Sequence, residues 1–251
     1  MNQIVKKQII MCPYCGFHRT SADGKHGDKA YFMCQGCEKR FAVPFDRHIR
    51  STLPEGAWAG RRVFIFGGGS SVAKFDWSKL QSQDRTISIN SSWKNFYNAN
   101  RIPTIQFSGD QLFWKQVSND LLFRKSVGLV AALDHDRTLD RGFLVPIAKE
   151  SKRHWAENYD DGIRYAANSG IAALNLADVL GSESIRLVGF DLDGTDREGR
   201  HFPDLIKTHE HFLTTFEEIA PLVKSKVVVI NDKSPLNKIQ FGRRRKRRSN
   251  S

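Results

Sequence analysis

The sequence has few of the features that mark secreted and membrane proteins. It contains four cysteines in 251 residues, and no apolar run approaches the length of about 18 residues that a membrane span needs. The first twelve residues, MNQIVKKQIIMC, lack the apolar core and small-residue cleavage site of a signal peptide. We therefore expect a cytoplasmic protein without a membrane span, in which cysteines bind metal or stay reduced.

Charge is nearly balanced in the middle of the chain and strongly positive at both ends. Of the formal charge of +12, residues 1–50 carry +5 and the run Arg243 to Arg248 carries +6. A hydrophobic content of 40% is sufficient for a folded core between these ends. We expect residues 242–251 to form a disordered basic tail, and both ends to favour a polyanion such as nucleic acid. The alternative is a solvated tail that only aids solubility.

The four cysteines occur as two C-x2-C pairs separated by eighteen residues. This spacing is typical of a zinc site with four thiolate ligands, and because all four positions are then filled, the role of the ion is structural. Lys29 to Met33 reads as a strand leading to the second pair. We predict a zinc ribbon over residues 1–50, with the ligands Cys12, Cys15, Cys34 and Cys37.

From residue 58 to 241 short β-rich runs alternate with helical stretches. This alternation predicts an α/β fold with a mostly parallel, Rossmann-like sheet and helices on both faces. In such folds ligands bind beyond the carboxyl ends of the strands. The predicted strands are 63–66, 86–89, 103–107, 127–133, 185–189 and 227–230.

A glycine-rich turn, Gly67, Gly68 and Gly69, follows the first of these strands. Consecutive glycines let the backbone approach a phosphate closely, and Ser71 then opens a helix with free N–H groups. The spacing matches neither G-x-G-x-x-G nor the P-loop, which disfavours ordinary dinucleotide binding and P-loop hydrolysis. A tight turn without a ligand remains the alternative.

Polar residues end the next two strands, at Asn90 and Asp110. A second candidate anion site is Asn168-Ser169-Gly170, which precedes an apolar helix that ends at Gly181. The alternative for Asn168 or Ser169 is a helix cap alone. The segment Asp191 to Thr195 spells a phosphatase signature, but it lies too late in the chain for that family. We therefore expect Asp191 at a strand end facing the cleft, as a candidate catalytic residue.

Taken together, these motifs resemble the bacterial family-42 sialyltransferases, the 6-hydroxymethylpterin diphosphokinase-like proteins and phage proteins with the same pattern. The resemblance implies a nucleotide held by the glycine turn, Asn90 and the Ser169 helix start. It also implies a histidine that acts as general base on an acceptor hydroxyl, with His209 in the best position and His201 and His211 as alternatives. The residues that carry the resemblance are 63–71, 89–90, 168–170, 187–191 and 230–235.

These observations predict a nucleotide-dependent transferase, most simply a glycosyltransferase-like enzyme using a nucleotide sugar. Its zinc ribbon and tail direct it to nucleic acid, as would suit a phage enzyme that modifies DNA in the host cytoplasm. One alternative is a diphosphokinase that transfers pyrophosphate from ATP, with Mg²⁺ held by Asp110, Asp191 and Asp193. The other is a nucleic-acid-binding protein whose nucleotide pocket is degenerate.

Overall fold

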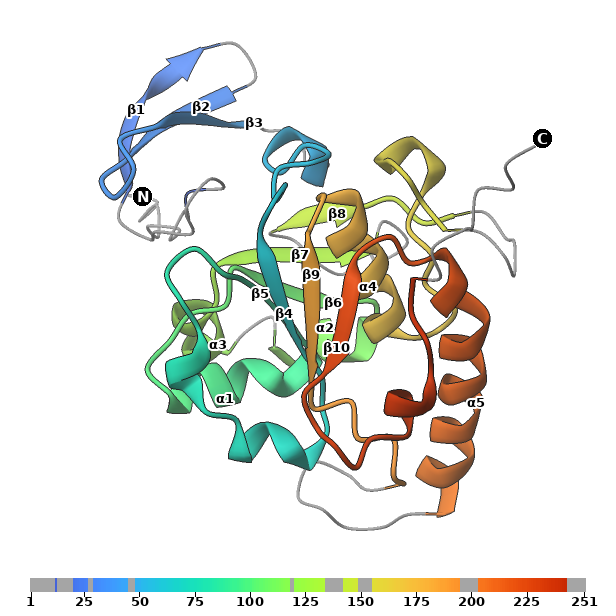
Figure 1. The fold of residues 1–251 in the computed structure, drawn as a ribbon. Coiled ribbons are helices and arrows are strands. Elements are labelled where there is room, and N and C mark those ends of the chain that lie inside the picture. The colour runs from blue at the N-terminus through green and yellow to red at the C-terminus, as the bar shows by residue number, and fades with distance from the viewer. Residues whose placement is uncertain are drawn as a thin grey trace, which may run out of the picture.

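The computed structural model describes residues 12, 20–26, 29–44, 48–117, 120–133, 142–148, 155–194 and 203–242. They form a small antiparallel sheet and a larger parallel sheet with helices on both faces (Figure 1). None of the described helices has the length and apolar character needed to cross a membrane. The predicted tail lies outside the described residues.

The small sheet has the order β1-β2-β3, and both of its pairings are antiparallel. Strand β2 covers the predicted strand and carries Cys34 at its end, so the turn that follows holds Cys37 next to it. Phe41 of β3 packs beside Cys12 and Cys34 in the centre of this unit. The strands are β1 Thr20–His26, β2 Lys29–Cys34 and β3 Arg40–Pro44.

The large sheet has the order β10-β9-β4-β5-β6-β7-β8, and every neighbouring pair is parallel. The Rossmann-like architecture predicted from the alternation of strands and helices is thus confirmed. The sequence indicated six of these strands and missed β8, a three-residue strand at the edge of the sheet. The strands are β4 Arg62–Phe66, β5 Arg85–Ile89, β6 Ile105–Ser108, β7 Leu129–Leu133, β8 Phe143–Val145, β9 Ser184–Val188 and β10 Lys226–Val229.

Helices α4 and α5 cover one face of the sheet, while α1 to α3 cover the other (Figure 1). After its first residue, helix α4 is apolar on all sides apart from Asn175 and Asp178, and it is buried over most of its length. As predicted, it starts after Asn168 and stops before Gly181, whose φ of +80° suits glycine. The helices are α1 Trp93–Asn98, α2 Gln111–Val117, α3 Leu121–Ser126, α4 Ser169–Val179 and α5 Pro203–Ile219.

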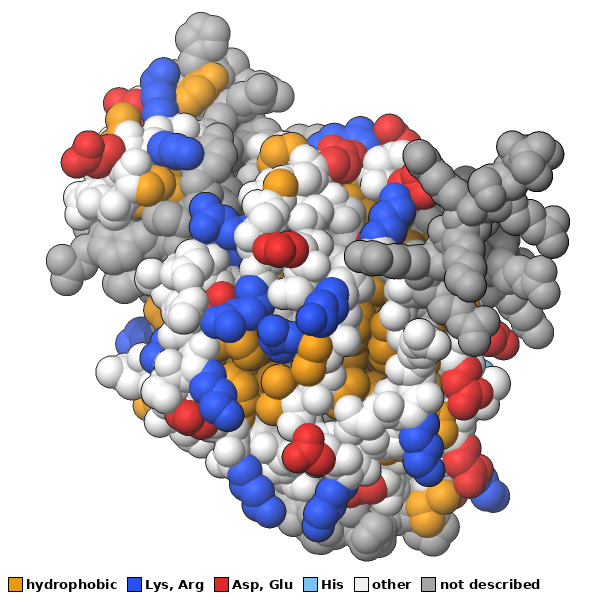
Figure 2. All heavy atoms as spheres, viewed as in Figure 1, with side chains coloured by type: hydrophobic (Ala, Val, Ile, Leu, Met, Phe, Trp, Pro, Cys, Tyr) orange, Lys and Arg blue, Asp and Glu red, His pale blue; other side chains and the backbone are white. Residues whose placement is uncertain are grey.

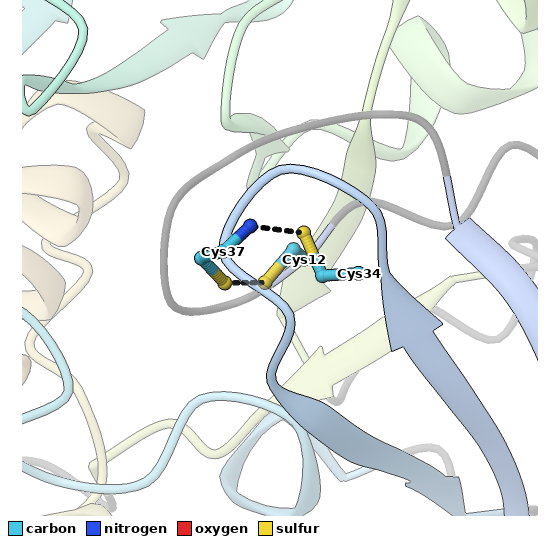
Figure 3. Close-up of side chains that lie close together, drawn as sticks. All are labelled: Cys12, Cys34 and Cys37. Atoms are coloured by element: carbon cyan, nitrogen blue, oxygen red, sulfur yellow. Dashed lines mark hydrogen bonds between the residues drawn. The ribbon is translucent and has the colours of Figure 1, made fainter.

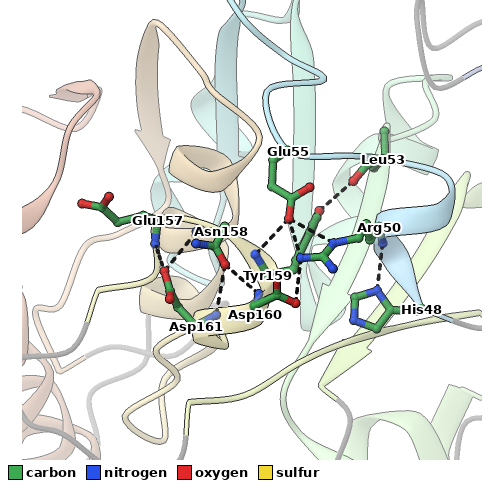
Figure 4. Close-up of polar contacts among 9 residues, drawn as sticks. All are labelled: His48, Arg50, Leu53, Glu55, Glu157, Asn158, Tyr159, Asp160 and Asp161. Carbon is green, nitrogen blue, oxygen red and sulfur yellow. Dashed lines mark hydrogen bonds and ion pairs between the residues drawn. The ribbon is translucent and has the colours of Figure 1, made fainter.

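The segment between the two sheets packs with the body. Ile49, Leu53 and Trp58 are buried in the main core, although the sequence analysis began that domain only at residue 58. A polar network fastens the same segment to the loop before α4 (Figure 4). In it Arg50 forms ion pairs of 2.7 Å with Glu55 and 3.0 Å with Asp160. These contacts tie residues 49–58 to the sheet.

Candidate functional site at the carboxyl edge of the sheet

The order of the strands reverses between β4 and β9. The chain runs outward from β4 through β5 to β8 on one side, and through β9 to β10 on the other. Ligands in open parallel sheets bind beyond the carboxyl ends of the strands at such a reversal. Here those ends carry Gly67 to Gly69 after β4 and Gly189 to Asp191 after β9.

Two of the three glycines in the first turn are required by the fold itself. Gly67 N–H donates to the Val188 carbonyl at 2.8 Å, and Gly69 N–H donates to the Gly189 carbonyl at 2.9 Å. A Cβ at Gly67 would lie 2.5 Å from the Gly189 oxygen, and one at Gly69 would lie 2.4 Å from an Asp191 carboxylate oxygen. Glycine at 67 and 69 therefore lets the turn pack against the end of β9.

Gly68 differs from its two neighbours. It is exposed, a Cβ there would meet no atom within 4 Å, and its φ lies outside the left-handed region. Neither packing against the described residues nor the backbone conformation requires glycine at this position. A ligand that approaches the backbone closely supplies a reason for it.

Asp191 braces this turn from inside the protein. It is buried, and it accepts hydrogen bonds from Ser71 N–H at 2.8 Å, Ser71 Oγ at 2.5 Å and Asn231 Nδ2 at 2.7 Å. Both carboxylate oxygens are thus occupied, which does not fit the cleft-facing chemical role expected for Asp191. The same bonds correct the expectation for Ser71: its N–H is not free, and it is the second residue of a short 3-10 helix, Ser70–Lys74.

A second polar cluster joins the ends of β5 and β6 to the start of α4. Asn90 has a φ of +49°, and its Oδ1 accepts a bond of 2.6 Å from the Ser108 hydroxyl. Ser169 Oγ accepts a bond of 3.0 Å from Gly109 N–H. No bond within the described part of the chain uses the Asn90 Nδ2 group or the Ser169 hydroxyl proton as donor, so both are open to a ligand.

The start of α4 is capped by the protein. Asn168 Oδ1 accepts bonds from Gly170 N–H at 2.7 Å and Ile171 N–H at 3.2 Å, so the helix-cap alternative for Asn168 is the one observed. A Cβ at Gly170 would lie 2.7 Å from the Phe190 ring. Gly170 and the Asn168 amide oxygen therefore build the helix start. Within the described part of the chain, the Ser169 hydroxyl proton and the Asn168 Nδ2 group are the side-chain donors of this motif that form no hydrogen bond.

Tyr165 is a member of this cluster that the sequence analysis did not identify. Its hydroxyl donates to the Gly109 carbonyl at 3.0 Å, and its ring would lie 2.4 Å from a Cβ at Gly109. Burial, with a smaller contribution from Asp110, raises the pKa of its phenol. The signal available in the sequence was a tyrosine three residues before the helix cap, which has no distinctive spacing.

His209 lies on α5, half-buried, beside the loop that follows β9. Its Nδ1 accepts a hydrogen bond of 2.9 Å from Gly194 N–H. Burial lowers the pKa of the imidazole, while Asp193 and Asp191 oppose that shift. The neutral ring thus carries its proton on Nε2 and has no free lone pair, because Nδ1 already accepts a bond. The ring as it lies is a hydrogen-bond donor, which does not fit the expected role of general base.

Of the two alternative histidines, His211 is exposed on α5 and His201 lies outside the described residues. The proposed Mg²⁺ ligands are not gathered. Asp110 is exposed and accepts a bond of 2.8 Å from Leu112 N–H, while Asp191 is occupied as described above. Within the described ranges, Asp110, Asp191 and Asp193 do not form a group of metal-ligating atoms. This geometry gives no support to the diphosphokinase alternative.

Three of the four predicted zinc ligands come together in the small sheet (Figure 3). The ligand atoms of Cys12, Cys34 and Cys37 lie within 4.8 Å of one another, and Cys12 Sγ is 3.6 Å from Cys37 Sγ. Thiolates at about 2.3 Å around a tetrahedral ion lie about 3.8 Å apart. Cys34 Sγ accepts bonds from the N–H groups of Gly36 and Cys37, which stabilise a thiolate. The cluster fits zinc; Cys15, the predicted fourth ligand, lies outside the described residues.

No protein-family model and no curated protein sequence matches this chain. Among solved structures, it is similar to the α-2,3-sialyltransferase Cst-I from Campylobacter jejuni at 16% identity and a TM-score of 0.49, over 73% of this chain and 80% of that one. It is also similar to CstII from the same organism in complex with cytidine-5′-monophosphate, at 17% identity and a TM-score of 0.44, over 73% and 86%. A CstII complex with CMP and a trisaccharide acceptor gives 18% identity and a TM-score of 0.47, over 72% and 86%.

Proposed function

We propose that this protein is a nucleotide-dependent transferase whose donor binds at the carboxyl edge of the large sheet, most simply a nucleotide-sugar transferase. The observation that carries the proposal is Gly68. It is a glycine at the reversal of the strand order for which the described part of the chain supplies no structural reason. The motif series in the sequence supports the reaction class, since it resembles families that act on activated nucleotides.

The hydrogen-bond donors that remain unused at this edge of the sheet define how the nucleotide substrate binds. The backbone of the exposed turn at Gly68 faces the phosphate, while Asn90 Nδ2 and the Ser169 hydroxyl donate to the ribose or the base. Asp191 and Asn231 hold the turn in place and touch no substrate, because their contacts lie behind it. Asn168 and Gly170 have the same supporting role at the start of α4.

His209 acts on the leaving group in this proposal. An acceptor oxygen forms a bond to the transferred carbon, the bond from that carbon to the nucleotide phosphate breaks, and the hydroxyl proton passes to the leaving phosphate. The Nε2–H of the neutral imidazole donates a hydrogen bond to that phosphate as its charge develops. The pKa of His209, lowered by burial, keeps the ring in this neutral form near pH 7.

In the second part of this proposal, the acceptor substrate is a nucleic acid, and DNA is favoured over RNA. The charge of +11 carried by residues 1–50 and the terminal basic run supports it, because cations at both ends of the chain neutralise phosphates without reading sequence. The zinc ribbon is then the folded part of the chain that directs the enzyme to nucleic acid, and the tail is the other part. The motif series shared with phage proteins supports a role in the modification of phage DNA.

The test starts from a thermal-shift screen of nucleotides and nucleotide sugars with the full chain. A true donor at one hundred times its dissociation constant stabilises the fold by about 2.7 kcal/mol. If no nucleotide shifts the transition while the protein binds DNA, the enzyme proposal fails and a non-catalytic nucleic-acid-binding protein takes its place.

With a donor identified, the role of His209 is tested by two substitutions. His209→Gln retains an N–H donor and should keep most of the turnover, whereas His209→Ala should reduce kcat by about 10²-fold, as for the loss of one stabilising donor. A general base would give a different result: both variants would be inactive, and wild-type kcat/KM would fall on acidification through the pKa of His209.

A further inference from the structure

A cavity of about 430 Å³ lies at the amino edge of the large sheet, at the opposite ends of the strands from the candidate site. Its charged lining consists of four cations and two carboxylates, a net charge of +2, although residues 51–242 together carry only +1. Figure 2 shows Lys and Arg side chains gathered on this face over β4, β9 and β10. The charged residues of the lining are Arg61, Arg62, Arg186, Lys226, Asp84 and Glu183.

One of these cations is fixed rigidly. Arg62 donates to Asp84 from Nε at 2.9 Å and from Nη2 at 2.6 Å, and also to the Lys79 carbonyl at 3.2 Å. Its guanidinium lies 5.1 Å from the centre of the Phe64 ring. Asp84 is buried, and its Oδ2 also accepts the Gln81 N–H at 2.8 Å. Asp84 is therefore fully used in holding Arg62, whose remaining nitrogen, Nη1, has no hydrogen bond to the described part of the chain.

The other three cations of the lining have no acidic partner among the described residues. Arg61, Arg186 and Lys226 form no salt bridge with any described residue, although Arg61 and Arg186 are half-buried. Guanidinium groups that no carboxylate engages keep several N–H donors for an anion in the cavity. Glu183 is exposed and has no cationic partner among the described residues either, so it is the one uncompensated negative charge in the lining.

We propose that this cavity binds a phosphate group. Its lining brings together two guanidinium groups and one ammonium that form no ion pair with a described residue. Arginine forks match phosphate oxygens in a bidentate manner. The site does not rest on the proposed function, since it lies at the other edge of the sheet and shares no residue with the carboxyl-edge site. The phosphate comes either from the backbone of a nucleic acid or from a small phosphorylated molecule.

The experiment uses two substitutions that change the charge of the cavity in opposite directions, and each has a matched control. Arg186→Gln removes a cation from the cavity, and Glu183→Gln removes the opposing carboxylate. Lys238→Gln and Glu217→Gln make the same charge changes at exposed positions that form no ion pair within the described ranges. All four variants are compared with the wild-type protein. Affinity for pyrophosphate is measured by calorimetry, and affinity for a ten-nucleotide single-stranded DNA by fluorescence anisotropy.

We expect Arg186→Gln to weaken binding by about tenfold and Glu183→Gln to strengthen it, with each control within twofold of wild type. A change in the pyrophosphate titration alone identifies a small phosphate ligand, whereas a larger change with DNA identifies a backbone phosphate. The proposal is overturned if wild type binds neither probe, or if each control changes affinity as much as its partner in the cavity, because binding would then follow net charge alone. Melting temperatures near wild type confirm that the variants are folded.

Discussion

At the scale of single residues, three adjacent glycines have different physical roles. The turn after β4 needs Gly67 and Gly69 because the end of β9 occupies the space where their Cβ atoms would lie. Gly68 has open space around it and an ordinary φ. The triplet seen in the sequence therefore consists of two glycines that packing requires and, between them, one that packing against the described residues does not require.

A pair of alanine substitutions separates these roles. Gly68→Ala should leave the melting temperature unchanged or raise it slightly, since the native backbone accepts alanine and the unfolded chain loses conformational freedom. The same substitution should lower nucleotide affinity by about tenfold, because the new methyl group faces the phosphate. Gly69→Ala should destabilise the fold by about 1–3 kcal/mol through its clash with Asp191. Melting curves and nucleotide titrations measure both effects. Unchanged nucleotide affinity in Gly68→Ala would contradict the proposed donor site.

His209 gives a prediction about the pH dependence of stability. Burial lowers the folded-state pKa of His209 below its unfolded value of about 6.5. Between the two pKa values the unfolded chain binds more protons than the native one, so stability falls as the pH falls from 6.5 through the folded-state pKa. His209→Gln cannot be protonated and should lose less stability on acidification from pH 7 to pH 5. Chemical denaturation at several pH values measures the free energy of unfolding of both proteins. If that free energy falls equally with pH in wild type and in His209→Gln, the prediction is wrong.

At the scale of elements, the small sheet and the large sheet rely on different sources of stability. Among the described residues, the buried centre of the small sheet consists of Phe41, Cys12 and Cys34, with Phe32 and Cys37 partly buried beside them. If the predicted zinc site is occupied, the ion therefore supplies most of the folding free energy of this unit. The large sheet has an extended apolar core, which includes Ile49, Leu53 and Trp58 from the connecting segment. Loss of the metal should therefore unfold the small sheet and leave the large sheet folded.

This expectation is tested by removing one thiolate. Cys34→Ser should lose about one equivalent of zinc, and the amides of β1 to β3 should exchange freely, while those of β4 to β10 keep their protection. Elemental analysis and hydrogen exchange measured by mass spectrometry give the two readouts. Gln35→Ala, in the same turn but exposed, is the control and should retain its zinc. A Cys34→Ser protein that keeps both metal and protection would exclude the site.

At the scale of the whole molecule, positive charge lies at both ends of the chain and at the amino edge of the large sheet. The candidate donor site lies at the other edge, so a polyanion bound to these cations need not compete with a nucleotide. Binding that depends on the neutralisation of many phosphates falls steeply with salt concentration. The salt dependence of DNA binding thus reports how many of these cations take part.

Deletion of residues 243–251 removes six cations and should lower both the affinity for DNA and the slope of log affinity against log salt. The slope should fall by about 0.7–0.9 for each phosphate that the tail neutralises in the wild-type protein. Deletion of residues 249–251 alone removes no charged side chain and serves as the control. Anisotropy titrations at several salt concentrations give the slopes. If both truncated proteins show the wild-type slope, the tail does not bind DNA.

The sequence by itself determined the parallel α/β class, six of the seven strands, the buried helix after Asn168 and the cysteine spacing. These features depend on local patterns: apolar periodicity, turn residues, helix caps and the distance between cysteines along the chain. Only the tertiary structure decided which glycine is unconstrained, that Asp191 braces a turn, and that the Nδ1 lone pair of His209 is occupied. It also decided that Arg61, Arg186 and Lys226 share a cavity. Each of these outcomes depends on interactions between segments far apart in the chain, and those interactions are fixed by strand order and register, which no local pattern specifies.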